Sequence, residues 1–393
     1  MITEIDASIG WARIAEPSDV QAGELISILG MQEAWIWLNK ASERSDMTVQ
    51  PAEIRDVFSD DDRMFKRAIQ RWTKRLHAVD LDREHKNSRL VGAEIVTHTS
   101  PYWPHQLDDL GPSKPHCLWV RGDVELLGGA QHGVSIVGSR ELTQYGEHVT
   151  TQFVSALMDS SCTVVSGGAF GVDACAHRTA VHLEVPTLAV FAGGIDRMYP
   201  AGNKELLASV IDAGGALVSE VPVGAVPMKS RFLSRNRIIA ALSRSTVVIE
   251  AAWRSGALST AHHALEIGRD VGAVPGPITS AQSAGCHRLL RETPTQLIGG
   301  VEDFREFVFP HGDVSRGPEE VLIAPVHCLT DVQRRVLDAL STRRCMRVDE
   351  VSTASGIAEI HCIGQLGGLE SMGLIRRSAG GWMRVQTSKT NQK

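Results

Sequence analysis

Three glycine-rich segments of the chain could hold phosphate groups, because each follows a short apolar run and precedes a stretch with helical periodicity. Glycine lets the backbone approach an anion closely, and the free amide groups at the start of a helix point toward it. Any one of these segments could equally be an ordinary turn between a strand and a helix. Together, at successive strand ends, they predict one anion-binding edge, made of Gly138-Ser139-Arg140, Ser166-Gly167-Gly168 with Gly171, and Gly193-Gly194.

A short cationic segment, residues 229–237, carries four cations around one aromatic side chain. Cations bind the phosphate backbone electrostatically, and an aromatic ring can stack on a base whose face is not hidden in a duplex. The pattern therefore favours single-stranded nucleic acid. The alternative is a solvated, basic helix start with the ring in the core. The candidate residues are Lys229, Arg231, Phe232, Arg235, Asn236 and Arg237.

Two further segments could complete such a site. Ser255 and Gly256 stand where the N-terminus of a helix could accept another phosphate. The stretch from Pro275 to Arg288 is expected to close the rim of the site, although Arg288 could also be a plain surface charge.

The overall composition restricts how the chain can bind nucleic acid. With 393 residues and a formal net charge of −6, it cannot rely on bulk positive charge, so any such site must be a local patch. The seven cysteines are scattered and form no C-x-x-C pair, so neither a zinc or other metal site nor a disulfide framework is predicted. We find no apolar run of membrane-spanning length and no secretory signal, so a cytoplasmic location is expected.

The motifs of several enzyme classes are missing from the sequence. There is no G-x-x-x-x-G-K-[ST] loop, no G-x-S-x-G elbow and no H-E-x-x-H motif. We also find no obvious carboxylate cluster of the kind that two-metal nucleases need. The sequence therefore predicts a binding protein without catalytic residues and without a cofactor.

The elements that must position the site alternate along the middle of the chain. Short runs that are apolar throughout alternate with amphipathic helices, which predicts an α/β fold with a parallel sheet covered on both faces. Ligands of such sheets bind outside the carboxyl ends of the strands, where the glycine-rich segments lie. The predicted strands are 117–120, 134–137, 163–165, 187–191, 216–218, 246–249 and 271–274, and the predicted helices are 145–159, 172–183, 203–212, 235–243 and 257–267.

Composition and periodicity also divide the chain into domains. Residues 1–90 are predicted to form a small helical domain, and residues 91–308 the α/β domain. A Pro/Gly-containing linker over 309–328 leads to a compact unit at 329–386. That unit is predicted to contain helices at 331–340, 348–355 and 358–372 and a Gly-Gly hairpin, which is typical of a winged helix.

In their order and spacing, the loops resemble those of the DprA/Smf family of DNA-processing proteins over about residues 117–305. Each motif alone is weakly specific, but the ordered set is highly specific. The motifs are Gly138-Ser-Arg140, Ser166-Gly-Gly-Ala-x-Gly-Val-Asp, Gly193-Gly-Ile-Asp-x-x-Tyr-Pro, Phe232-x-x-Arg-Asn-Arg and Glu250-Ala-x-x-x-Ser-Gly.

The resemblance implies an extended Rossmann-like fold that binds single-stranded DNA without cleaving it and forms a homodimer. It also implies that the protein helps to load the recombinase RecA onto DNA during natural transformation. DNA contacts are implied for Arg140, Lys229 and Phe232. Where the family often has Phe-Pro, this chain has Phe232-Leu233, which changes the loop but keeps the cations and the ring.

Two other functions are compatible with parts of the sequence. Related Rossmann-like folds include nucleoside-monophosphate phosphoribohydrolases, but we do not find their P-G-G-x-G-T-x-x-E loop here. A transcription regulator could sense a nucleotide with the α/β domain and act through the winged helix. The basic hairpin fits duplex binding and a protein-docking or spacer role about equally; its cations are Arg376, Arg377 and Arg384.

Overall fold

The computed structural model describes residues 2–43, 54, 58, 63–158, 160–310, 331–341, 344–371, 374–378 and 381–385. Contacts divide the chain into two compact units, residues 1–315 and 316–393, and each is described by itself. The predicted linker lies outside the described residues from 311 onward, and so does the end of the chain from 386.

The N-terminal helices form a small bundle around three tryptophans. Trp11 meets Trp72 and Trp35 edge-on, with ring centroids 5.2 and 6.1 Å apart. The first helix also carries Ile9 and Ala12 into the core of the sheet, so the bundle belongs to the same compact unit as the α/β part. The helices are α1 (Glu4–Ile14), α2 (Val20–Leu29), α3 (Met31–Glu43), α5 (Arg63–Leu76) and α6 (Leu81–Leu90).

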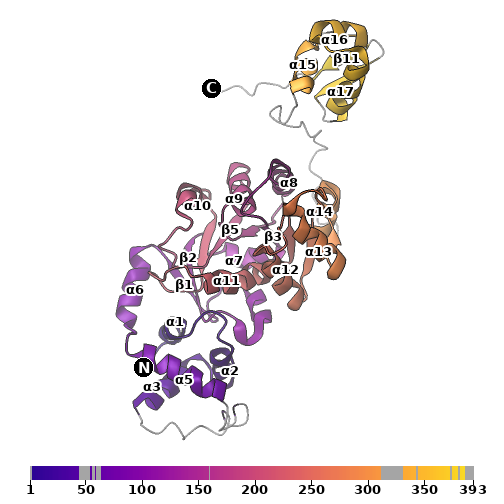
Figure 1. Ribbon diagram of the computed structural model, residues 1–393. Helices are drawn as coiled ribbons and strands as arrows, with labels where there is room; N and C mark the ends of the chain where they lie inside the picture. The colour runs from indigo at the N-terminus through magenta and orange to yellow at the C-terminus, as the bar shows by residue number, and fades with distance from the viewer. Residues whose placement is uncertain are drawn as a thin grey trace. The chain divides into compact units, whose positions relative to one another are not determined.

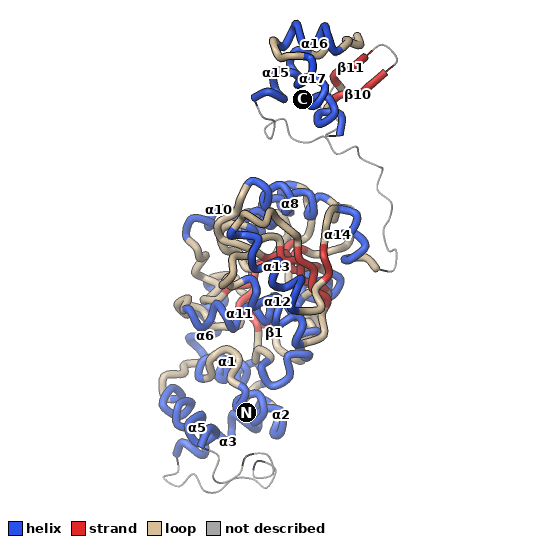
Figure 2. The backbone as a smooth tube through the Cα atoms, turned by 45° about the vertical axis from the view of Figure 1, so that its right-hand side comes forward, coloured by secondary structure: helices blue, strands red, loops and turns tan. Residues whose placement is uncertain are grey.

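Nine strands of the described residues form one sheet in the order β1-β2-β6-β5-β4-β3-β7-β8-β9. Figures 1 and 2 show this sheet among the helices of its unit. From β6 to β9 every neighbouring pair is parallel, and β3 lies at the centre with β4 on one side and β7 on the other. The strands are β1 (Glu94–Val96), β2 (Leu118–Gly122), β3 (Val134–Val137), β4 (Val164–Ser166), β5 (Thr187–Phe191), β6 (Ala216–Ser219), β7 (Ser245–Val248), β8 (Asp270–Ala273) and β9 (Gln296–Leu297).

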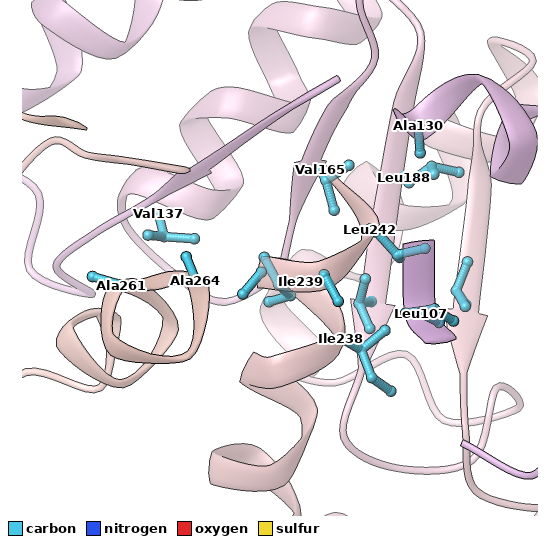
Figure 3. Close-up of a cluster of buried hydrophobic side chains, with 14 of the residues drawn as sticks. Leu107, Ala130, Val137, Val165, Leu188, Ile238, Ile239, Leu242, Ala261 and Ala264 are labelled. Atoms are coloured by element: carbon cyan, nitrogen blue, oxygen red, sulfur yellow. The ribbon is translucent and has the colours of Figure 1, made fainter. Parts of the chain in front are cut away.

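Helices cover both faces of this sheet. One face packs against α11, α12 and α13, and Figure 3 shows Ile239 and Leu242 of α11 in the same cluster as Val165 and Leu188 of the sheet. The other face packs against α8, α9, α10 and α14. The helices are α7 (Leu126–Gly129), α8 (Gln144–Ser155), α9 (Val172–His182), α10 (Lys204–Asp212), α11 (Lys229–Leu242), α12 (Ala257–Glu266), α13 (Ala284–Glu292) and α14 (Val301–Val308), with short 3-10 turns η1 (His105–Ser113), η2 (Ala130–His132), η3 (Ala201–Asn203) and η4 (Ala281–Ser283).

The α/β prediction is confirmed, with two differences. The run 117–120, assigned to a parallel sheet, forms β2, which pairs antiparallel with β6. An apolar run indicates that a strand is buried on both faces, but it does not indicate whether the strand is parallel or antiparallel to its neighbour. The helix predicted to begin at Arg235 begins at Lys229, so the cationic segment is itself helical.

Within its described residues, the C-terminal unit contains three helices and a two-stranded hairpin in the predicted order. They are α15 (Asp331–Ala339), α16 (Val348–Ser355), α17 (Glu359–Ser371), β10 (Ile375–Ser378) and β11 (Gly381–Arg384). A small core that includes Val336, Val351 and Leu366 holds them together. The second glycine of the predicted Gly-Gly turn, Gly381, starts β11, whereas residue 380 lies outside the described residues. The assignment as a winged helix stays a prediction.

In the part of the chain that the structure describes, no helix has the length and apolar character that crossing a bilayer requires.

Candidate nucleic-acid interface

A groove of about 800 Å³ opens at the carboxyl ends of the central strands. Its walls come from the loop after β3, the loop after β7 and the first half of α11. The strand order reverses between β3 and β7, and ligands of open α/β sheets bind at such a switch point. The topology of the sheet therefore accounts for the position of the groove.

Three cations line the groove, and within the described residues none of them has a carboxylate at ion-pair distance. They are Arg140, Lys229 and Arg235. Arg140 and Lys229 are exposed, so both can reach a ligand without moving the core. Unpaired cations along one groove create a local positive potential in a chain whose net charge is negative.

An aromatic pair stands beside these cations. The rings of Phe232 and Tyr199 are 5.6 Å apart, and the guanidinium carbon of Arg140 lies 5.4 Å from the centre of the Phe232 ring. Phe232 is half-buried and Tyr199 is 49% exposed, so both rings remain accessible from the groove. This combination of π-faces and cations suits an unpaired base next to its phosphate.

Arg235 differs from the other two cations because it is only 4% exposed. Its Nε is buried and has no hydrogen-bond partner in the structure. Burial lowers the pKa of Arg235 to about 10, the nearby Asp173 carboxylate acts in the opposite direction, and Arg140 lowers it further. A guanidinium remains charged at neutral pH even so. Because this guanidinium lines the groove and has an unused donor, it is suited to receive an anion from the groove.

Glycines and one buried carboxylate bring the loops close together. The Glu250 side chain, after β7, accepts hydrogen bonds from the Thr143 hydroxyl (2.6 Å) and amide (3.1 Å), which ties it to the loop after β3. A Cβ at Gly138 would lie 2.5 Å from Val172 and 2.9 Å from the Glu250 carbonyl. Gly171, with a φ of +80°, leaves no room for a Cβ beside the Ser139 carbonyl. The glycines are thus required for the approach of the three segments that hold Arg140.

Two of the cations assigned to the site from the sequence lie outside the groove. Arg231 is bound by Glu16 of the N-terminal bundle, with nitrogen–oxygen distances of 3.1 and 3.2 Å. Arg237 is buried and bound by Glu220 at 2.6 and 2.8 Å. A carboxylate already neutralises each of them, so we withdraw both from the proposed interface.

The remaining candidate residues also fall into two groups, those that line the groove and those that lie behind it. Gly138, Ser139, Asn236, Ser255 and Gly256 line the groove. The others support it from behind. Ser166 donates to the Ile136 carbonyl, and a Cβ at Gly167 would collide with the guanidinium of Arg235. Gly168 packs against Leu207, and Gly193 and Gly194 are buried under the 222–227 segment.

The groove also contains residues that the sequence did not single out as ligands. Tyr199 lines it, and its place in a motif beside Gly193 and Gly194 was an available signal. Gln282 reaches the groove from η4 and binds Ser139 at 2.9 Å. Nothing in the local pattern marks Gln282, because its role depends on a contact 143 positions away in the chain.

The comparisons with known proteins identify the family. The family described as DNA recombination-mediator protein A matches residues 94–309, which include the whole groove. The chain belongs to this family. It is 42% identical to the putative DNA processing protein DprA of Mycobacterium tuberculosis over 268 residues, which make up 68% of each chain. The resemblance to the DprA/Smf family is thereby confirmed.

Two solved structures of the family agree with the fold. DprA from Streptococcus pneumoniae superposes with a TM-score of 0.58 at 28% identity, covering 77% of this chain and 96% of the other. DNA processing protein A from Helicobacter pylori superposes with a TM-score of 0.50 at 28% identity, covering 56% of this chain and 98% of the other. The latter structure concerns a single-stranded DNA binding mode of that protein.

Proposed function

We propose that this protein binds single-stranded DNA in the groove at the β3–β7 switch point. The observation that carries the proposal is the set of three unpaired cations beside two accessible aromatic rings. Arg140 and Lys229 would hold phosphates at the surface, and Arg235 would hold one at the base. Family membership and the single-stranded DNA binding mode of the Helicobacter pylori protein support this assignment.

We propose further that the groove binds DNA without cleaving it. Its two carboxylates are already engaged. Asp173 accepts hydrogen bonds from the amides of Gly167 (3.1 Å) and Ala169 (3.3 Å), and Glu141 accepts one from Gln282 (3.2 Å). Within the described residues no three metal-ligating side chains form a cluster. This arrangement favours a binding protein over a metal-dependent nuclease or a phosphoribohydrolase.

The remaining expectations rest on the family resemblance. They are a cytoplasmic location, a homodimer, and assistance to a RecA-type recombinase as it loads onto DNA during recombination or natural transformation. The groove is compatible with this role, because a protein that transfers a DNA strand to a recombinase must bind the phosphate backbone and make no base-specific contacts.

Phe232→Ala is expected to weaken binding of a dT oligonucleotide by about 1–3 kcal/mol, roughly 5–150-fold in Kd, because the ring provides the stacking face. Fluorescence anisotropy at constant salt measures the change. Leu233→Ala is the control, since Leu233 is a groove-lining apolar neighbour on the same helix that is more exposed than Phe232 and has no π-face. Equal Kd values for wild type and Phe232→Ala would show that no base stacks on this ring.

A further inference from the structure

A second exposed aromatic side chain stands at the outer edge of the groove. Trp253 is 50% exposed and lies in the loop after β7, between Ala252 and Ser255, which both line the groove. Trp253 itself is not part of the lining. A large aromatic side chain left half exposed beside a binding groove is available to a ligand that extends beyond the groove.

Arg288 of α13 holds this tryptophan in place. Its guanidinium carbon lies 5.1 Å from the centre of the indole, and its Nη1 donates a hydrogen bond to the Trp253 carbonyl at 3.3 Å. Its only close carboxylate among the described residues is Glu292, with a nitrogen–oxygen distance of 3.8 Å on an exposed helix surface. Arg288 therefore retains charge that a phosphate could use.

The pair of Trp253 and Arg288 resembles the pair of Phe232 and Arg140 in the groove. Arg140 stands 5.4 Å from the Phe232 ring, and Arg288 stands 5.1 Å from the Trp253 ring. An arginine against one face of a ring fixes the orientation of the ring and leaves its exposed part free to contact a base. The neighbouring Arg254 is also exposed and adds a second cation to the same loop.

We propose that Trp253 and Arg288 form a second nucleotide subsite, which binds one base and one phosphate of the strand where it leaves the groove over residues 252–256. This inference rests on the proposed function. In the Glu250-Ala-x-x-x-Ser-Gly motif, Trp253 occupies a position that the motif leaves open, so the subsite belongs to this chain rather than to the motif. The subsite acts only on strands that are long enough to reach it.

A length series tests this proposal. Anisotropy titrations of the full chain use dT oligonucleotides of about 4 and about 12 nucleotides, within the range of known single-strand sites. Trp253→Ala is expected to weaken the long oligonucleotide about tenfold and the short one less than twofold, whereas Trp253→Phe keeps a ring and recovers most of the affinity. The long oligonucleotide is also expected to quench the intrinsic fluorescence of wild type more than that of Trp253→Phe.

Phe232→Ala separates failure of the subsite from failure of the proposed function. If Phe232→Ala weakens both oligonucleotides and Trp253→Ala changes neither, the groove binds DNA and the subsite is refuted. If neither variant has an effect, the proposed function fails as well. Equal loss at both lengths for Trp253→Ala also overturns the subsite. A change of sedimentation coefficient in Trp253→Ala with unchanged DNA affinity would instead assign this surface to contact between two copies of the chain.

Discussion

Replacing Arg235 by methionine is expected to remove most of the affinity for single-stranded DNA and to lower the free energy of unfolding by a smaller amount. The side chain is 4% exposed and lines the groove, and its Nε has no hydrogen-bond partner, so part of its donor capacity is unused in the folded protein. Methionine fills a similar volume without the charge, and the buried Asp173 carboxylate loses its nearby cation but keeps its hydrogen bonds from the amides of Gly167 and Ala169. The loss of a charged hydrogen bond to phosphate is expected to cost binding about 1.5–3 kcal/mol.

Urea denaturation and anisotropy on the same preparations measure the two effects. Arg231→Met is the matched control, because Arg231 lies on the same helix but is bound by Glu16 outside the groove, and it should keep its DNA affinity. A saturating oligonucleotide should raise the Tm of wild type more than that of Arg235→Met. A stability loss of several kcal/mol in Arg235→Met, with normal DNA affinity, would make Arg235 a structural residue.

Arg237→Ala is expected to have the opposite profile, with a loss of about 3–5 kcal/mol of stability and normal DNA affinity of the folded protein. Two hydrogen bonds join its guanidinium to Glu220, and its Nε donates to the Ser113 carbonyl at 2.8 Å. Both charged side chains are buried, so alanine would leave the Glu220 carboxylate buried without its cation. The urea midpoint measures the loss.

A double variant tests whether the buried, unpaired Glu220 carboxylate causes the loss of stability. Arg237→Met with Glu220→Gln removes both charges at similar volume, so it should recover much of the stability lost in Arg237→Ala. If Arg237→Ala retained full stability and lost DNA binding, Arg237 would belong to the interface after all.

The three arginines of α11 show what the sequence can and cannot predict. The pattern around Phe232 correctly indicated that cations gather where the strands end, since spacing and residue type are local properties. It could not separate Arg235 from Arg231 and Arg237, because their partners lie elsewhere in the chain. Glu16, which neutralises Arg231, is 215 positions away, and no periodicity connects the two.

For the sheet too, local sequence predicts some features, whereas others depend on contacts between distant parts of the chain. The apolar runs correctly located the central strands, because burial on both faces requires such runs. The antiparallel direction of β2 and the contribution of Gln282 depend on pairings over long stretches of chain. The three glycine-rich segments were located correctly as strand-end turns, but only contacts show that Gly193 and Gly194 are buried behind the groove.

The most direct test of DNA binding in the groove measures the affinity for a single-stranded oligonucleotide and for its duplex across a range of salt concentrations. Wild type is compared with the double variant Arg140→Ala, Lys229→Ala. We predict that wild type prefers the single strand. The double variant should bind more weakly, with a slope of log K against log salt that is smaller by about 1.4, or about 0.7 for each lost phosphate contact. Equal affinity for the duplex, or an unchanged slope in the double variant, would contradict the groove as the site of DNA binding.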